Sequence, residues 1–273
     1  MSFHRYMPAA PLRRFVESIW SISNIGVPSS RQHVCPNGGA MQLVIDLMDR
    51  SLSFFDGAEH HRVRVPLLAG PYSKAFCIDP SEFTEVLGIQ FKPGAARVFF
   101  DVPAHELHNV DIPLEDLCPA EARQLRDELL SAHGLSGQFL VIERYLFRKL
   151  AGAASIPAAV EYAVDEFRRN GSRRAVADVV SELGLSHTRF IKVFREHVGL
   201  TPKLFCRLQR FGRVMQRIQR GLPVNWSDVA AECGYFDQAH LIHEFRDFSG
   251  LTPLSYAQSL PGGENSVRER TVS

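Results

Sequence analysis

The sequence predicts a two-domain chain of the α+β class, in which a β-rich N-terminal domain precedes an all-α C-terminal domain. Three observations support this prediction. Short β-rich runs separated by turn signals fill residues 1–92, helical periods replace them from residue 119 onward, and one helical unit occurs twice between residues 175 and 256. With 273 residues, the chain is long enough for two domains with cores of their own.

The composition excludes several classes of protein. Hydrophobic residues make up 45% of the chain and charged residues 22%, which is typical of a folded globular protein and not of a disordered one. No apolar run approaches the ~18 residues of a membrane helix, and the N-terminal segment lacks the apolar run of a signal peptide. The five cysteines are odd in number and scattered, which favours reduced thiols. We therefore expect a cytoplasmic protein without a membrane partner.

The N-terminal region, residues 1–118, is expected to form a small barrel or sandwich, because short strands alternate with Gly-, Pro- and Asn-containing turns. Short helices are expected at Pro11–Glu17 and Ala95–Phe100, and residues 103–118 are expected to be mostly irregular. The predicted strands are Ser18–Ile22, Met41–Leu47, Leu52–Phe55, Val63–Leu68, Ala75–Ile78 and Thr84–Phe91.

A helical segment, residues 119–155, is expected to link the two domains. Apolar residues at near-helical spacing predict helices over Ala120–Ala132 and Ser136–Leu150, which could also serve dimerisation. Small residues from Ala151 to Pro157 mark a boundary, and the C-terminal domain is predicted to span 156–260. The last residues, 261–273, lack an apolar period and are expected to be disordered.

The C-terminal region contains an internal duplication. Ala177–Gly184 aligns with Ser227–Gly234 at an offset of fifty residues, and 194–205 aligns with 245–256 at an offset of 51. Ten positions in about thirty are identical, including the run Gly-Leu-Thr-Pro. A duplicated helical unit explains this agreement better than chance does.

Each repeated unit is predicted to be a helix, a glycine-containing turn and a second helix. The first unit covers about 173–197, with its second helix at 187–197, and the second covers about 225–249, with its second helix at 237–248. Gly184 and Gly234 supply the turns. One such helix-turn-helix is also common in ordinary helical cores, but two in tandem favour DNA binding.

A basic row lies between the two units. It has no acidic neighbour, and its spacing of three and four places it along one helical face, either as a solvated surface or as a contact for phosphates. Its members are Lys203, Arg207, Arg210, Arg213, Arg217 and Arg220.

The second unit resembles the signature of the AraC/XylS family of bacterial transcription regulators. The residues that match are Ala230, Gly234, Tyr235, Asp237, Gln238, His240, Leu241, Phe245, Arg246, Gly250, Thr252, Pro253 and Tyr256. The resemblance covers about residues 156–260. It implies two recognition helices that enter successive major grooves of promoter DNA and are joined by a long helix at about Pro202–Gly221. Residues 5–118 resemble, less specifically, the cupin-like sensor domain of one branch of the family, through Pro11–Glu17, Trp20, Gly70–Pro71 and Phe91–Ala96.

The exposed side of each second helix must carry the DNA contacts, because the opposite side is core. The resemblance assigns base reading to Thr188, Ile191 and Lys192 and to Ala239, Ile242 and His243, and Gln238 also faces outward. Lys192 and His243 stand where the family often has Arg. The two isoleucines either contact thymine methyl groups or pack on a neighbouring helix. The residues expected to position the phosphates are His187, Arg195, Arg207, Arg210 and Arg246.

The resemblance implies that the N-terminal domain senses a small-molecule or protein effector and that RNA polymerase is a further partner. Side chains that could line a barrel interior are Trp20, His33, Cys35, Met41 and Gln42, although residues of these types are more often plain core or turn. A homodimer is compatible with the sequence but not required, since one chain carries two reading helices. The sequence is compatible with an activator and with a repressor of transcription.

The alternative is a metal-dependent cupin-type enzyme with an appended DNA-binding domain. The histidine clusters argue against it, because none shows the His-x-His with a following acid that such metal sites use. These clusters are His33 with Cys35, His60 with His61, and His105 with His108. We therefore expect no enzyme activity, no cofactor and no metal. A pure interaction protein is a third alternative, and the doubled motif speaks against it.

Overall fold

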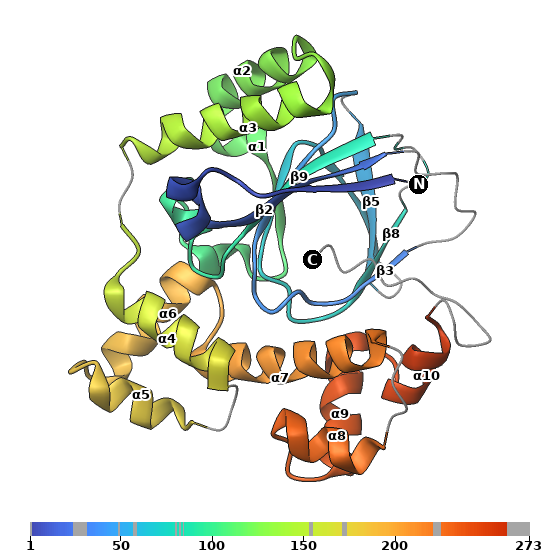
Figure 1. The fold of residues 1–273 in the computed structure, drawn as a ribbon, viewed down its shortest axis with the longest axis vertical. Coiled ribbons are helices and arrows are strands. Elements are labelled where there is room, and N and C mark those ends of the chain that lie inside the picture. The colour runs from blue at the N-terminus through green and yellow to red at the C-terminus, as the bar shows by residue number, and fades with distance from the viewer. Residues whose placement is uncertain are drawn as a thin grey trace.

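The computed structural model describes residues 2–23, 32–48, 50–56, 59–79, 81, 83, 85–152, 155–170, 174–220 and 225–260. The N-terminal region contains two antiparallel sheets that face each other (Figure 1). The six-stranded sheet has the order β1 (Ser2–Tyr6), β2 (Val16–Ser23), β9 (Glu85–Phe91), β4 (Gln42–Ile45), β7 (Leu67–Ala69) and β10 (Asp111–Pro113). The four-stranded sheet has the order β3 (Gln32–Val34), β8 (Phe76–Asp79), β5 (Ser51–Asp56) and β6 (Glu59–Arg64).

The six-stranded sheet is covered on both faces. Strand β4 shows this by its alternation, since Leu43 and Ile45 join the main core while Gln42 and Val44 face the four-stranded sheet. Strand β9 lies between β2 and β4, and its residues from Leu87 to Phe91 are all buried. The run from Val86 to Phe91 is apolar except for Gln90, which is also buried, and this fits a central strand covered on both faces.

Several short elements differ from the sequence prediction. The predicted strand Val63–Leu68 is two strands, β6 and β7, because Pro66 has no N–H for a ladder bond. The predicted helix Pro11–Glu17 is a 3-10 turn, η1 (Ala10–Arg14), and Val16 already begins β2.

The segment 103–118, expected to be mostly irregular, holds η3 (Ala104–Leu107), β10 and α1 (Leu114–Leu117). Such short pieces form through pairing with distant strands, here β10 with β7, so local periodicity does not reveal them. Ala95–Phe100 contains only η2 (Ala96–Val98). Strands β1 and β3 were not predicted.

Helices α2 (Pro119–Leu130) and α3 (Gly134–Leu150) confirm the two predicted helices and pack along one side of the six-stranded sheet (Figure 1). The C-terminal region then consists of helices. They are α4 (Ala158–Asn170), which was not predicted, α5 (Val176–Glu182), α6 (His187–Val198), α7 (Pro202–Gln219), α8 (Trp226–Cys233), α9 (Gln238–Ser249) and α10 (Pro253–Gln258). The predicted disordered tail lies outside the described residues.

The duplicated units have the same local structure. Ser186 and Asp237 cap α6 and α9 by accepting a hydrogen bond from the backbone N–H three residues on. The predicted turn glycines Gly184 and Gly234 both have a positive φ, and the two helices also end at left-handed glycines, Gly199 and Gly250. Helix α7 joins the two units, with α4–α6 near one end and α8–α10 near the other (Figure 1).

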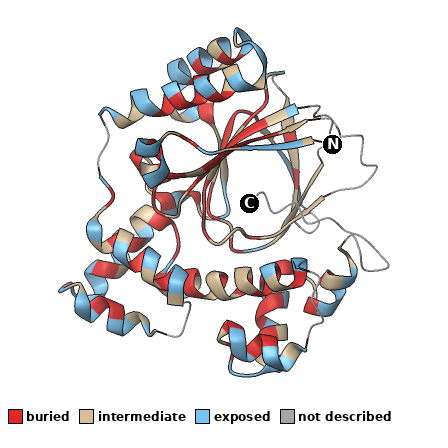
Figure 2. Ribbon diagram, in the orientation of Figure 1, coloured by how far each residue is buried: buried red, intermediate tan, exposed pale blue. Residues whose placement is uncertain are grey.

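The helical region is docked on the sheets at both ends of α7. At the first end, Arg14 makes two 2.7 Å bonds to Glu161. At the other end, the Ala75 N–H donates to the carbonyl of Phe248 at 2.8 Å. Between them, Gln209 Nε2 donates to the carbonyl of Gly38 at 2.8 Å. Buried residues run without a break from the sheets into the helices (Figure 2).

Gly199 and Gly250 provide a matched test of this docking. Both have a positive φ, but a Cβ on Gly199 would lie 2.4 Å from Pro71 Cγ and 2.7 Å from the carbonyl oxygen of Ala104, whereas a Cβ on Gly250 would meet nothing within 4 Å. We expect Gly250→Ala to cost about 1–2 kcal/mol of unfolding free energy from backbone strain alone. Gly199→Ala should cost about 1–3 kcal/mol more, from overpacking. Urea denaturation of both variants measures the difference, and equal losses would mean that the docked interface is not held in solution.

Candidate nucleic-acid interface and pocket

Helix α6 presents the predicted base-reading side chains to solvent. Phe190 and Phe194 are buried against the rest of the unit, and this fixes the opposite face outward. On that face Thr188 and Lys192 are exposed and Ile191 is half-buried. His187 and Arg195, predicted to contact phosphates, are also exposed.

Helix α9 repeats this arrangement. Leu241 and Phe245 are buried, while Gln238, Ala239 and His243 are exposed. Arg246, predicted to contact phosphate, is exposed. Ile242 is half-buried and packs against the core, as the packing alternative for the isoleucines requires.

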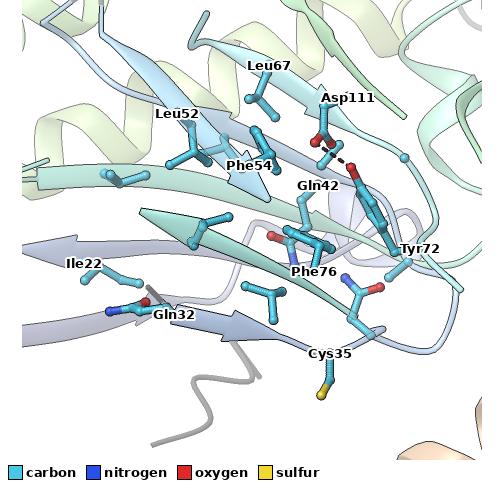
Figure 3. Close-up of a pocket in the computed structure, with 18 of the residues that line it drawn as sticks. Ile22, Gln32, Cys35, Gln42, Leu52, Phe54, Leu67, Tyr72, Phe76 and Asp111 are labelled. Carbon is cyan, nitrogen blue, oxygen red and sulfur yellow. Dashed lines mark hydrogen bonds between the residues drawn. The ribbon is translucent and has the colours of Figure 1, made fainter. Parts of the chain in front are cut away.

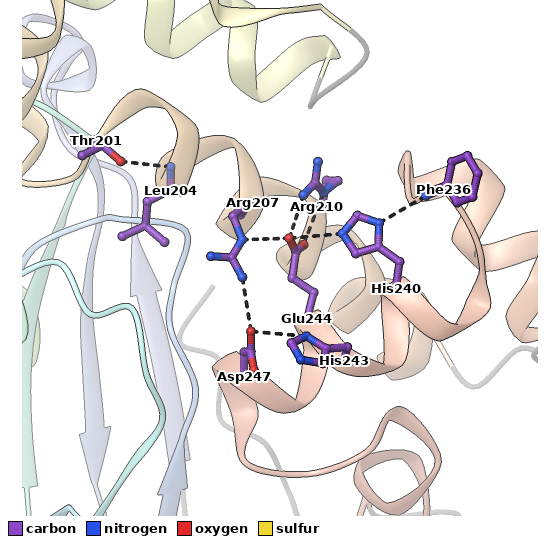
Figure 4. A network of polar contacts seen from close by, with 9 residues as sticks. All are labelled: Thr201, Leu204, Arg207, Arg210, Phe236, His240, His243, Glu244 and Asp247. Atoms are coloured by element: carbon purple, nitrogen blue, oxygen red, sulfur yellow. Dashed lines mark hydrogen bonds and ion pairs between the residues drawn. The ribbon is translucent and has the colours of Figure 1, made fainter.

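A buried glutamate ties the basic row of α7 to α9. Glu244 Oε1 accepts bonds from Arg207 Nε at 2.8 Å and from a terminal nitrogen of Arg210 at 2.7 Å (Figure 4). Glu244 is 3% exposed. Burial alone would raise the pKa of its carboxyl, but the hydrogen bonds and charges of the two arginines outweigh burial and hold the pKa below its ordinary value.

The network continues to the exposed face of α9. A terminal nitrogen of Arg207 lies 3.4 Å from Asp247 Oδ2, and His243 Nδ1 lies 3.5 Å from the same oxygen. Arg210 also lies over the ring of Tyr235, 5.2 Å from its centroid. In the free protein, Arg207 and Arg210 thus orient α9 on α7, and phosphate contact by these two arginines stays a prediction.

The sequence analysis missed one exposed side chain at this surface. Phe236 stands in the turn before α9 and is 92% exposed, and its backbone N–H donates to His240 Nδ1 at 3.4 Å (Figure 4). Its place between a buried tyrosine and the helix cap Asp237 is the signal that could have identified it, because a large apolar residue at a helix entry that packs on nothing is free to contact a partner.

The N-terminal sheets enclose a pocket of about 200 Å³. Trp20, His33, Cys35 and Gln42, predicted from the sequence, line it. Met41 is not among the lining residues and takes the alternative role, that of plain core. Side chains alternate along a strand, so Met41 lies on the other face and is buried in the main core.

One end of the pocket is polar. The Tyr72 hydroxyl donates to Asp111 Oδ2 at 2.6 Å (Figure 3). Burial raises the pKa of Asp111 from 3.8 to about 6, although the Tyr72 hydrogen bond opposes the shift. The remaining lining is largely apolar, with side chains from β4, β5, β7 and β8.

The histidine clusters of the sequence do not converge. His60 stacks on Phe55 and His61 on Phe54, both on the four-stranded sheet, while His108 Nε2 lies 2.9 Å from Ser73 Oγ. Over the described ranges, no three His, Cys, Asp or Glu side chains come close enough to hold a metal ion. Nor do those ranges contain a helix with the length and apolarity needed to cross a membrane.

Comparison with known proteins separates the chain into two matched regions. Residues 179–259 match a helix-turn-helix domain family, and residues 4–113 match a domain of unknown function, DUF6597. The HTH-type transcriptional regulator GadX of Escherichia coli O157:H7 is 31% identical over 98 residues, which are 34% of this chain and 34% of GadX. An uncharacterized HTH-type transcriptional regulator of Haemophilus influenzae is 29% identical over 79 residues, 28% of this chain and 25% of that protein. The match spans a quarter to a third of these relatives.

Several solved structures align with this chain, ToxT and a dual regulator among them. ToxT from Vibrio cholerae is 12% identical and covers 96% of this chain and 100% of its own, with a TM-score of 0.46. A DNA-binding transcriptional dual regulator from Escherichia coli K-12 is 25% identical and covers 37% of this chain and 97% of its own, with a TM-score of 0.33.

Both relatives are HTH-type transcriptional regulators, and the helix-turn-helix domain match at 179–259 falls on the doubled unit. Residues 179–259 are therefore a helix-turn-helix domain, and the chain is similar over part of its length to HTH-type transcriptional regulators.

Proposed function

We propose that the chain is a sequence-specific transcription regulator that reads two successive major grooves of promoter DNA with α6 and α9. The observation that carries the proposal is the pair of outward faces at the two ends of one helix. Helix α7 has 18 residues and is therefore about 27 Å long. Successive major grooves on one side of B-DNA lie about 34 Å apart, a separation that two units attached at the ends of such a helix can match.

The proposal assigns base reading to the exposed residues Thr188, Lys192, Gln238, Ala239 and His243, with Phe236 at the entry to α9. The exposed arginines Arg195 and Arg246 contact the DNA phosphates in this proposal. RNA polymerase is the expected second partner, the site of action is the cytoplasm, and one chain suffices to span both grooves. The sequence matches favour this function over a metal-dependent enzyme.

The pocket between the sheets is proposed as an effector site, because its lining also contacts the DNA-binding region. His33 lines the pocket and hydrogen-bonds to the backbone of Ser249 at the end of α9. Gly38, next to the lining residue Asn37, accepts the bond from Gln209 of α7. A ligand that shifts residues 33–38 would change how α7 and α9 are held.

Selection of bound duplexes from a random-sequence pool tests the function. We expect a consensus with two half-sites, bound ~10³-fold or more tighter than scrambled DNA in fluorescence anisotropy, with affinity that falls steeply with salt. A pool that yields no consensus, with weak and equal binding to all duplexes, would contradict the proposal.

Two substitutions on α6 separate base reading from phosphate contact. Lys192→Ala should cost about 1–3 kcal/mol on the selected duplex and relax the preference at one position of the site. Arg195→Ala should weaken binding to selected and scrambled duplexes alike and reduce the salt slope by about one. Arg123→Ala, at an exposed position on α2, serves as the control and should leave the DNA affinity, the base preference and the salt slope unchanged. If Lys192→Ala behaved like Arg195→Ala, α6 would not be reading bases through Lys192.

A further inference from the structure

The pocket between the sheets has the size and walls of a site for one small ring. Its volume is about 200 Å³, and Leu52, Phe54, Phe76 and Ile78 form the wall on the four-stranded sheet. A dry apolar cavity of about 150 Å³ holds benzene. The pocket therefore accommodates an aromatic or branched apolar group with a short substituent.

A polar row crosses the opposite wall. The strand registers pair Gln42 with Gln90 on one side and with Ala69 on the other, and pair Ala69 with Asp111. Asp111 and Gln42 thus lie in one row on the same face of the sheet, and both line the pocket. Figure 3 shows Asp111 with Tyr72 at one end of the cavity.

One carboxylate oxygen of Asp111 in this row accepts no hydrogen bond from the described residues. Tyr72 occupies Asp111 Oδ2, but Oδ1 is buried and, among the described residues, has no hydrogen-bond partner. A buried carboxylate without its full set of donors is costly, and Asp111 lines the pocket, so the lining favours a ligand that brings a donor to this carboxylate.

The charge of the lining restricts the chemical class of the ligand further. Asp111 is the acidic residue of the lining, and no Lys or Arg is among the described residues that line the pocket. With its pKa near 6, Asp111 is mostly ionised at neutral pH. A ligand carboxylate would lose its hydration beside a buried negative charge and gain no cation in return. A ligand ammonium would supply both the missing donor and the missing charge.

We propose that the pocket binds a small apolar amine, with the ammonium group paired with the Asp111 carboxylate and the apolar group lying between the two sheets. The pocket should discriminate against carboxylates of the same size. The proposal rests on the effector function above only in treating this ligand as the effector, because binding itself is measured without DNA.

Trp20 supplies the readout. It lines the pocket, and the chain has only one other tryptophan, Trp226 at the start of α8. In the full-length Trp226→Phe variant, fluorescence therefore reports Trp20 alone. We would titrate this variant at pH 7.5 with phenethylamine, 2-phenylethanol and phenylacetate, which share one ring with a two-carbon side chain and differ in the polar end.

We expect phenethylamine to bind at least tenfold more tightly than phenylacetate, with 2-phenylethanol between them. Asp111→Asn in the same background should weaken amine binding at least tenfold and change alcohol binding by less than about threefold, because the amide keeps the cavity but removes the charge. Asp101→Asn, at an exposed acid outside this pocket, should leave all three affinities unchanged. Near-UV circular dichroism confirms that each variant is folded.

Three results would overturn the proposal: phenylacetate binding as tightly as the amine, no binding of the amine, or an unchanged amine affinity in folded Asp111→Asn. Anisotropy on the selected duplex, with and without the amine, is a separate readout. Loss of DNA recognition there contradicts the proposed function, while the fluorescence titration still decides the ligand class.

Discussion

Glu244→Gln is expected to lower the free energy of unfolding by about 3–5 kcal/mol, the usual cost of breaking a buried ion pair from one side. Glu244 is 3% exposed and compensates Arg207 and Arg210, and the Arg210 side chain is itself only 13% exposed. Glutamine of the same shape cannot neutralise either guanidinium. Because these contacts set the position of α9 on α7, the variant should also lose specific DNA affinity under conditions where it remains folded.

The control for this prediction is an exposed ion pair between α7 and α8. Glu232 of α8 is 55% exposed and lies 3.6 Å from Arg217 of α7, so Glu232→Gln should cost no more than about 1 kcal/mol. The pKa of Glu244 is lowered on folding, so its stabilisation is present above the ordinary value of 4.5 and is lost as the pH falls below it. Urea denaturation at pH 7.5 and at lower pH measures both effects. A loss below 1 kcal/mol at pH 7.5 would show that Glu244 is not the centre of the junction.

Asp111→Asn is expected to act in the opposite direction and to raise the free energy of unfolding by about 2 kcal/mol at pH 7.5. Folding raises the pKa of Asp111 from 3.8 to about 6. The ionised carboxylate therefore costs roughly 3 kcal/mol above pH 6. The amide removes this cost but weakens the bond from Tyr72 by about 1 kcal/mol.

The stability gained in Asp111→Asn should increase with pH. The cost is absent below pH 3.8, where the carboxyl is protonated in both states, and it grows between pH 3.8 and about 6. The advantage of Asp111→Asn should therefore vanish at acid pH. Asp101→Asn is the matched exposed control. If Asp111→Asn were less stable than the native chain at pH 7.5, the carboxylate would be a structural group, and its retention would need no ligand to explain it.

The helix-turn-helix units could be predicted from the sequence because their signals are local. Caps such as Ser186 and Asp237 and the left-handed turn residues Gly184 and Gly234 lie within a few residues of the helices they define. The duplication doubled these signals, and the outward faces of α6 and α9 followed from the helical period. Helix α4 was not predicted, although its buried residues Val160, Ala163, Val164 and Phe167 recur at helical spacing.

The pocket and the junction could not be predicted in the same way. Asp111 reaches the pocket only through the register of β10 with β7, some forty residues away in the chain. Glu244 lies 34 and 37 residues from its arginine partners. Such contacts depend on the tertiary fold, and the sequence pattern of α9 marks Glu244 only as a polar residue beside the core. The face on which Met41 lies could not be predicted for a similar reason, because a shift of one residue along a strand moves a side chain to the other face of the sheet.

The central claim, that α6 and α9 read two grooves together, is tested most directly by the spacing of the half-sites in the selected duplex. Insertion of five base pairs between them turns one half-site by about half a helical turn away from the other. We predict that the full chain then loses at least ~10²-fold in affinity and approaches its binding to scrambled DNA, because α7 holds the two units in one orientation. Unchanged affinity for the lengthened duplex would contradict the account, since it would mean that the two units bind independently or that only one of them reads DNA.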